Sequence, residues 1–207
     1  NHLLAFIFHQ IPFVHTNVNG VNGLSNSHVK SIIQDSYGFI WLGTRNGLNR
    51  YDGVSMQVYP CFDEVSGHGN QVISALYEDD RRQLWVGTDN GVYIQDLSTG
   101  KFSFFDAKTD KGEQISGQWV EDILSDPSGN IWVNVPNLGV YRYHVPTKKL
   151  FRYILLPGSD KSKNFPQSIC IDKEGTLWVG TNGASIFRYC PAQDTFEACA
   201  KEALKDD

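Results

Sequence analysis

The chain has 207 residues, a formal net charge of −5 and 13% aromatic residues. It contains no run of lysine and arginine, so its composition argues against a surface for nucleic acid or anionic membranes. Its four cysteines form no CxxC pair and indicate neither a disulfide framework nor a zinc site. Frequent glycines and aromatic residues are typical of an all-β protein with many short strands.

The first 25 residues precede the repeated part of the chain. The start at Asn1 rather than at a methionine indicates a processed or truncated chain. Residues 3–8 are apolar but too few to span a bilayer. They fit the end of a signal peptide and equally a strand of the fold, and the residues leave both alternatives open. We therefore expect residues 1–25 to form a leader or a closing strand.

Beyond this leader, one motif recurs four times. In each copy an aspartate precedes a tryptophan by six residues, and the tryptophans follow one another at intervals of 44 to 47 residues. The four pairs are Asp35 and Trp41, Asp79 and Trp85, Asp126 and Trp132, and Asp172 and Trp178. A period of this length indicates a repeated supersecondary unit.

Each repeat is predicted to form four short antiparallel strands. In the first repeat the strands are expected at residues 29–35, 39–44, 48–51 and 55–59, and Asn46-Gly47 between two of them is a strong hairpin signal. The repeats cover about residues 26–60, 70–106, 117–154 and 165–199 of a region that spans 26–207. This pattern predicts an all-β fold, a β-propeller with about four four-stranded antiparallel blades visible, as part of a larger propeller.

Residues just before each aspartate support the blade interpretation. The third residue before it is large and aliphatic, as suits a face packed between blades: Ile32, Leu76, Ile123 and Ile169. The fourth residue before it is small or polar, as suits strands that converge on a central channel: Ser31, Ala75, Asp122 and Ser168. We expect each repeated tryptophan to be a wedge between blades rather than a ligand platform, and each aspartate to shape a turn.

The motif of the first repeat resembles the two-component regulator propeller repeat. The similarity begins at Gly23-Leu24-Ser25-Asn26, continues through Trp41 and Gly43-Thr44, and extends in later copies to about residue 199. Three departures put local turn geometry in question: Arg82 replaces a turn glycine, Asn134-Val135 replaces Gly-Thr, and Ala184 replaces an aliphatic residue after Gly183.

The resemblance implies a function that the residues alone do not. Such repeats form the periplasmic sensor of hybrid two-component systems in Bacteroides-like bacteria, ahead of an immunoglobulin-like domain, a membrane helix and a histidine kinase. It therefore implies a non-catalytic, N-terminal piece of an inner-membrane receptor that senses oligosaccharides from glycans, self-associates in the intact receptor and needs no cofactor. Four blades would close on themselves or form an open arc, and residues 6–14 would offer a strand to a distant blade.

Candidate binding residues follow from blade topology. Loops that enter the first strand and loops that join the second and third strands should lie together at the channel mouth. They supply His28, Arg45, Asn46, Gln71, Asp89, Gln118, Trp119 and Asn137. Amide, charged and aromatic side chains suit a hydroxyl-rich ligand. Turn chemistry explains Asn46 as well, and packing at the start of a strand explains Trp119 equally well.

Catalysis has little support in the sequence. It has no metal-spaced His, Cys and Glu cluster, no GxSxG motif and no phosphate-binding loop, and its six histidines are scattered. Cys190 and Cys199 flank a predicted hairpin, where a disulfide competes with simple apolar packing. Besides the sensor, two other functions stay in view: a protein-interaction propeller without a small ligand, and a propeller lyase.

Overall fold

The computed structural model describes residues 23–62, 67, 69–70, 72–155, 165–182 and 185–199. Every regular element in these ranges is a β-strand. The expectations for the leader before residue 23, for Gln71, for Gly183-Ala184 and for the C-terminal residues 200–207 lie outside the described residues.

Four sheets of four strands make up the fold. The first contains β1 (Val29–Gln34), β2 (Ile40–Thr44), β3 (Gly47–Tyr51) and β4 (Met56–Tyr59), and the second contains β7 (Ile73–Glu78), β8 (Gln83–Thr88), β9 (Gly91–Asp96) and β10 (Phe102–Phe104). The third contains β11 (Asp122–Ser125), β12 (Ile131–Val135), β13 (Gly139–His144) and β14 (Lys149–Tyr153). The fourth contains β15 (Pro166–Ile171), β16 (Leu177–Thr181), β17 (Ile186–Cys190) and β18 (Thr195–Ala198). A separate pair, β5 (Cys61–Phe62) and β6 (Gly69–Asn70), links the first two sheets.

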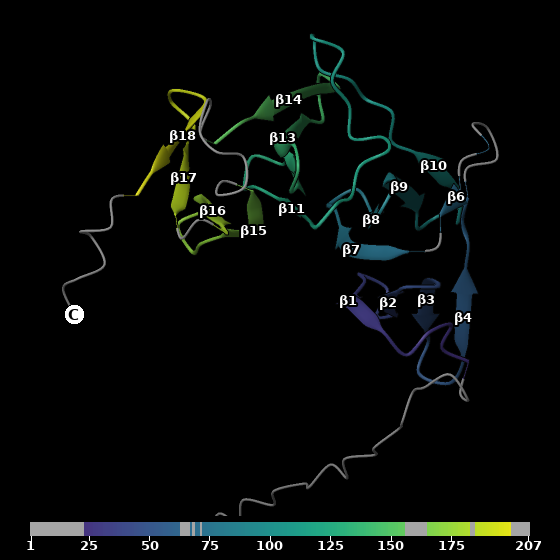
Figure 1. The fold of residues 1–207 in the computed structure, drawn as a ribbon. Coiled ribbons are helices and arrows are strands. Elements are labelled where there is room, and N and C mark those ends of the chain that lie inside the picture. Colours follow the sequence, from purple (N-terminus) through teal and green to yellow (C-terminus); the bar gives the residue numbers. More distant parts are fainter. Residues whose placement is uncertain are drawn as a thin grey trace, which may run out of the picture.

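These sheets are propeller blades. Within each, every strand pairs antiparallel with its neighbour in the sequence, so each blade is a continuous stretch of chain. Figure 1 shows the blades along an arc, with β1, β7, β11 and β15 on its inner side and the first and fourth blades at its two ends. The predicted propeller fold is therefore confirmed, and the arrangement is the open arc rather than a closed four-bladed ring.

The repeated aspartate joins a turn to a tryptophan. In the first blade the Asp35 Oδ1 accepts the backbone N–H groups of Tyr37 and Phe39, at 3.0 and 2.9 Å, and Gly38 takes a φ of 91°. The Asp35 Oδ2 accepts the indole N–H of Trp41 at 2.7 Å. The same indole bond recurs in the other blades, at 3.0, 2.8 and 2.5 Å. The predicted turn role is confirmed, and the constant six-residue spacing reflects this additional bond.

Two departures from the repeat, at Arg82 and Asn134, occupy defined positions in the structure. Arg82 adopts a φ of 59°, the left-handed conformation that Gly38 has in the first blade, so the turn keeps its form without glycine. Its guanidinium lies 4.7 Å above the ring of Tyr37 in the preceding blade. Asn134 is fully buried at the position that Gly43 occupies in the first blade. The question that Arg82 raises about the local turn geometry is therefore answered: the turn keeps the form that it has in the first blade.

The core lies between blades rather than inside one. Three apolar clusters fill the three boundaries between successive blades, and Trp41, Trp85 and Trp132 are among their largest fully buried side chains. The wedge interpretation is confirmed for these three. Leu76 and Ile123 are buried in the same clusters, as the repeat pattern predicts. Burial of this apolar area contributes about 25 cal/mol per Å².

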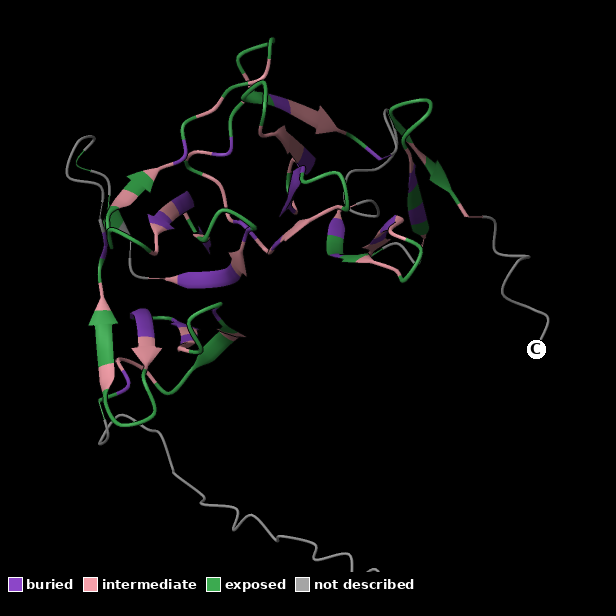
Figure 2. Ribbon diagram, turned by 180° about the vertical axis from the view of Figure 1, so that it is seen from behind, coloured by how far each residue is buried: buried purple, intermediate pink, exposed green. Residues whose placement is uncertain are grey.

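The outer faces of the two end blades are more exposed than the faces that meet at the boundaries between blades. Ile32, on the first blade, is exposed although its repeat equivalents are buried, and Trp178, on the fourth blade, is only half-buried. Figure 2 shows exposed segments on the first and fourth blades and mainly buried or intermediate strands in the middle of the arc. Each of these residues faces away from the rest of the arc, where no described blade packs against it.

All four cysteines are free thiols. Cys61 is buried between the first two blades, and this burial raises the pKa of its thiol to about 12. In the hairpin of the fourth blade, Cys190 pairs in register with Thr195. The structure therefore contains no disulfide between Cys190 and Cys199.

Candidate functional site

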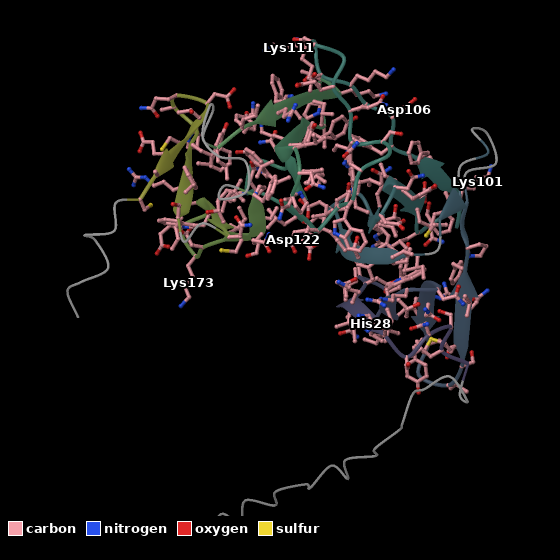
Figure 3. All side chains as sticks on the ribbon, viewed as in Figure 1. His28, Lys101, Asp106, Lys111, Asp122 and Lys173 are labelled. Carbon is pink, nitrogen blue, oxygen red and sulfur yellow. The ribbon has the colours of Figure 1, made fainter. Side chains whose placement is uncertain are left out.

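The predicted turn residues are spread over three blades. Arg45 and Asn46 form the exposed turn between β2 and β3, Asp89 lies in the equivalent turn of the second blade, and Asn137 in that of the third. His28 is exposed just before β1, and Figure 3 shows it and Asp122 on the inner side of the arc.

Asn46 is held by its own turn. Its backbone N–H donates to the Thr44 hydroxyl at 3.1 Å, and its side-chain amide donates to the Ser25 carbonyl at 3.5 Å. The Thr44 hydroxyl in turn donates to the Gly47 carbonyl at 2.9 Å. Asn90 repeats the first of these bonds with Thr88, also at 3.1 Å. The turn explanation therefore accounts for Asn46 without a ligand.

Trp119 occupies a different environment. It lies just before β11 with a half-buried ring, and its indole N–H donates to the Glu121 carboxylate at 2.5 Å. The Lys30 ammonium, which comes from β1, lies 5.5 Å from the ring centroid, within the range of a cation–π contact. Because β1 belongs to the first blade and Trp119 to the third, this contact crosses the inside of the arc.

Lys30 and Glu121 were not among the predicted site residues. They occupy the same repeat position, immediately before Ser31 and Asp122, which the pattern assigns to the channel. The equivalent residue of the second blade, Ser74, donates from its hydroxyl to the Val120 carbonyl at 2.5 Å. The charge of these side chains next to a channel position is the signal that would have identified them.

The three together form what we call the Trp119 cluster: Lys30, Trp119 and Glu121. It presents one aromatic face, one cation and one anion at the inner end of the third blade. Nearby, burial raises the pKa of the Asp122 carboxyl above its ordinary value. Gln118 precedes the cluster and is half-buried, with its backbone N–H donated to the Ile115 carbonyl at 3.1 Å. Gln71 lies outside the described residues.

A spacious groove lies elsewhere, between the third and fourth blades. It has a volume of about 670 Å³ and includes Asn130, Arg142, His144, Glu174 and Tyr189. None of the predicted site residues lines it.

The Arg142 side chain in this groove interacts with other side chains of the same chain. Its guanidinium donates to the hydroxyl of Tyr189 and to the Asp194 carboxylate, and it lies 4.6 Å from the ring of Phe151. Tyr153 and Tyr189 both donate to the same carboxylate oxygen of Asp194, each at 2.5 Å. We call this group the blade clasp, because it joins β13 and β14 to the fourth blade.

Contacts within the blade clasp shift the pKa values of Tyr189 and Asp194. Burial, with the hydrogen bond to Asp194, raises the pKa of Tyr189 to about 12. Burial alone would raise the pKa of Asp194, but the tyrosine hydroxyls and the Arg142 charge outweigh it and hold that pKa below its ordinary value. Asp194 therefore stays charged near neutral pH and acts as a structural link between Arg142 and the two tyrosines.

The described residues show neither a metal-binding cluster nor a membrane-spanning helix. No group of three or more His, Cys, Asp or Glu side chains there is placed to hold a metal ion. The described ranges likewise contain no helix long and apolar enough to cross a membrane.

Known proteins resemble this chain in sequence and in fold. Residues 23–46, 67–90 and 160–183 match the family model described as two component regulator propeller. The histidine kinase P4 of Formosa agariphila is 45% identical over 47 residues, which are 23% of this chain and 3% of that protein.

Two solved structures share the arc of blades. The extracellular domain of the hybrid two-component system BT3049 of B. thetaiotaomicron has a TM-score of 0.74 at 21% identity, over 90% of this chain and 26% of that one. The corresponding domain of BT4673 from the same organism has a TM-score of 0.71 at 22% identity, over 88% and 25%. The chain spans about a quarter of these domains, and at this identity the likeness shows the fold. Three stretches of the chain therefore match the two-component regulator propeller repeat, and the described residues fold as successive blades of a β-propeller.

Proposed function

We propose that this chain is a non-catalytic sensor segment of an extracytoplasmic two-component receptor that signals to a histidine kinase. The repeat family, the kinase named among its relatives and the extracellular domains that share its fold support this role. Contacts made by a ligand would signal by favouring one arrangement of the receptor over another. In the intact receptor that arrangement involves self-association.

We further propose that the ligand is an oligosaccharide and that the Trp119 cluster is its contact point. The observation that carries this is the half-buried Trp119 ring, fixed by its bond to Glu121 and flanked by Lys30. An aromatic face packs against the apolar side of a sugar ring, while an ammonium and a carboxylate exchange hydrogen bonds with its hydroxyls. Arg45, Asp89 and Asn137 extend the same surface along the turns of three blades.

Titration calorimetry of the chain against a panel of glycan oligosaccharides tests this proposal. Trp119→Ala removes the aromatic face, and we expect it to weaken binding about tenfold or more, since ring contacts of this kind are worth roughly 1.4 kcal/mol. Tyr37→Ala is the matched control, because Tyr37 is an exposed aromatic residue on the turn between β1 and β2, away from the cluster. Equal binding by Trp119→Ala and the unaltered chain would show that the cluster is not the contact point.

A second candidate is a protein-interaction propeller without a small ligand. The exposed apolar side chains at the two ends of the arc favour it, because surface groups such as Ile32 and Ile186 suit contact with another protein. If the unaltered chain binds an oligosaccharide and Trp119→Ala does not, the result favours the sensor over this second candidate.

A further inference from the structure

The first and third blades each place an arginine opposite the repeated tryptophan. Arg50 pairs in register with Trp41, and Arg142 pairs with Trp132. In both blades the guanidinium lies 5.7 Å from the centroid of that tryptophan ring. Planar guanidinium groups stack on aromatic rings, so each arginine has an aromatic environment by design of the repeat. The two blades can therefore be compared position by position around the arginine.

A phenylalanine fills the space beside the arginine of the first blade, and the third blade has no ring at that position. The ring of Phe39, two residues before the tryptophan, has its centroid 4.5 Å from the Arg50 guanidinium. Asn130 holds the same repeat position in the third blade, since the carbonyl of each residue accepts the backbone N–H of the repeated aspartate. Asn130 and Arg142 both line the groove of about 670 Å³. The space that a ring fills in the first blade is therefore open in the third.

Asn130 carries a buried acceptor that the described part of the chain leaves without a donor. The residue is only 9% exposed, and its side-chain Nδ2 donates to the Asp126 Oδ2 at 2.8 Å. This bond fixes the orientation of the amide group, so its Oδ1 lies on the side away from that carboxylate. No described residue donates a hydrogen bond to this oxygen. A buried acceptor without a donor is destabilising, and a bound group that donates to it relieves that cost.

The charges around the groove favour a positively charged ligand. Asp126 and Glu174 both line it, and Glu174 is exposed. The Arg142 guanidinium forms an ion pair with Asp194 at 3.1 Å, so its charge is balanced within the blade clasp. With His144 counted as neutral, the groove therefore has a net negative charge. A cation that approaches Glu174 gains a favourable contact and meets no repulsion from an unbalanced arginine.

We propose that this groove binds an extended segment of a partner protein, in which a tryptophan is followed by a basic residue. The tryptophan ring takes beside Arg142 the place that Phe39 has in the first blade, and aromatic anchors of this kind are common centres of protein contacts. Indole only donates hydrogen bonds, which suits a groove where Asn130 and Glu174 offer acceptors. No member of the Trp119 cluster lines this groove, so the site goes beyond the proposed function.

Nuclear magnetic resonance titration of the isotope-labelled chain with short peptides, capped at both ends, tests the site. We expect Gly-Trp-Lys to bind and to shift the resonance of the Asn130 side-chain amide. Gly-Phe-Lys keeps a ring and a charge but offers no donor from the ring, so it should bind about tenfold more weakly. Gly-Trp-Gly lacks the cation and should bind about two- to threefold more weakly, since an exposed ion pair contributes little.

Two variants of the chain locate the binding in the groove. Asn130→Phe copies the first blade and fills the open space, so it should abolish binding of Gly-Trp-Lys. Gln83→Phe is the matched control, because Gln83 has the same repeat position in the second blade, where Ile94 rather than an arginine pairs with the tryptophan. This control should bind like the unaltered chain. Glu174→Gln, at an exposed position, should reduce the binding of Gly-Trp-Lys to that of Gly-Trp-Gly.

The unaltered chain gives results that do not depend on any variant. Equal binding of Gly-Trp-Lys and Gly-Phe-Lys overturns the proposal, and so does the absence of binding by every peptide. Free indole that binds as tightly as Gly-Trp-Lys would overturn the choice of a polypeptide and indicate a small heterocycle. Trp119→Ala should still bind Gly-Trp-Lys, which keeps this test separate from that of the proposed sugar contact. Far-UV circular dichroism checks that Asn130→Phe keeps its strands.

Discussion

Replacing Asp35 by asparagine would test whether the repeated aspartate anchors the tryptophan wedge or only shapes a turn. Asparagine keeps one oxygen that can still accept from Tyr37 and Phe39. It then turns an amide N–H₂ toward the indole N–H of Trp41, which now donates to Asp35 at 2.7 Å. Both side chains are buried, so water does not replace the lost acceptor.

The expected loss follows from that geometry. A hydrogen bond to a charged group contributes about 1.5–3 kcal/mol, and a buried donor left without an acceptor adds to the cost of losing it. We therefore expect Asp35→Asn to lower the free energy of unfolding by about 2–3 kcal/mol. Trp41→Phe removes the donor together with part of the wedge, and it should destabilise the chain on its own by creating a cavity.

Urea unfolding of the unaltered chain, the two single variants and the double variant completes a double-mutant cycle. With phenylalanine at residue 41 no indole N–H remains, so Asp35→Asn should cost about 1.5–3 kcal/mol less than it does beside tryptophan. An equal cost in both backgrounds would refute the anchoring role and leave the aspartate as a turn residue alone.

Two further predictions concern the blade boundaries. Gly87→Ala should destabilise the chain by about 1–3 kcal/mol, since its Cβ would lie 2.7 Å from the Val120 Cγ1, and adding Val120→Ala should recover part of that loss in the same urea assay. The blade clasp should be acid-labile: because the pKa of Asp194 is lowered in the folded chain, its contribution is present above pH 3.8 and lost as the pH falls below it. Thermal melts across that range should therefore depend less on pH in Asp194→Asn than in the unaltered chain, and identical pH profiles would contradict this.

The blades could be predicted because their determinants are local. The first-blade strands expected at residues 29–35 and 39–44 are observed as Val29–Gln34 and Ile40–Thr44, since alternation and turn residues act over a few positions. The tryptophan wedges followed from their local context, because each tryptophan lies in a predicted strand between aliphatic neighbours, and the structure confirms the wedge for Trp41, Trp85 and Trp132. The indole bond to the aspartate was visible only as a fixed spacing, since its direction depends on how the hairpin places both side chains.

The candidate site was predicted less well because its geometry is not local. Lys30 and Trp119 are far apart in sequence, and only the curvature of the arc brings the first and third blades close enough for them to meet. Turn residues such as Asn46 had the expected location, but their bonds belong to the turn itself. Whether four blades close or stay open depends on small angles at each boundary, which no single residue determines.

Because every blade is made of consecutive strands, the chain can fold in the order in which it is synthesised. Contacts within a blade join nearby residues, which favours fast formation of each sheet. Trp41, however, reaches its buried position only when Ile73 and Leu76 arrive from the next blade. During synthesis, each new blade therefore exposes one apolar face until the next blade is made. The rate of translation determines how long that face is exposed and able to aggregate.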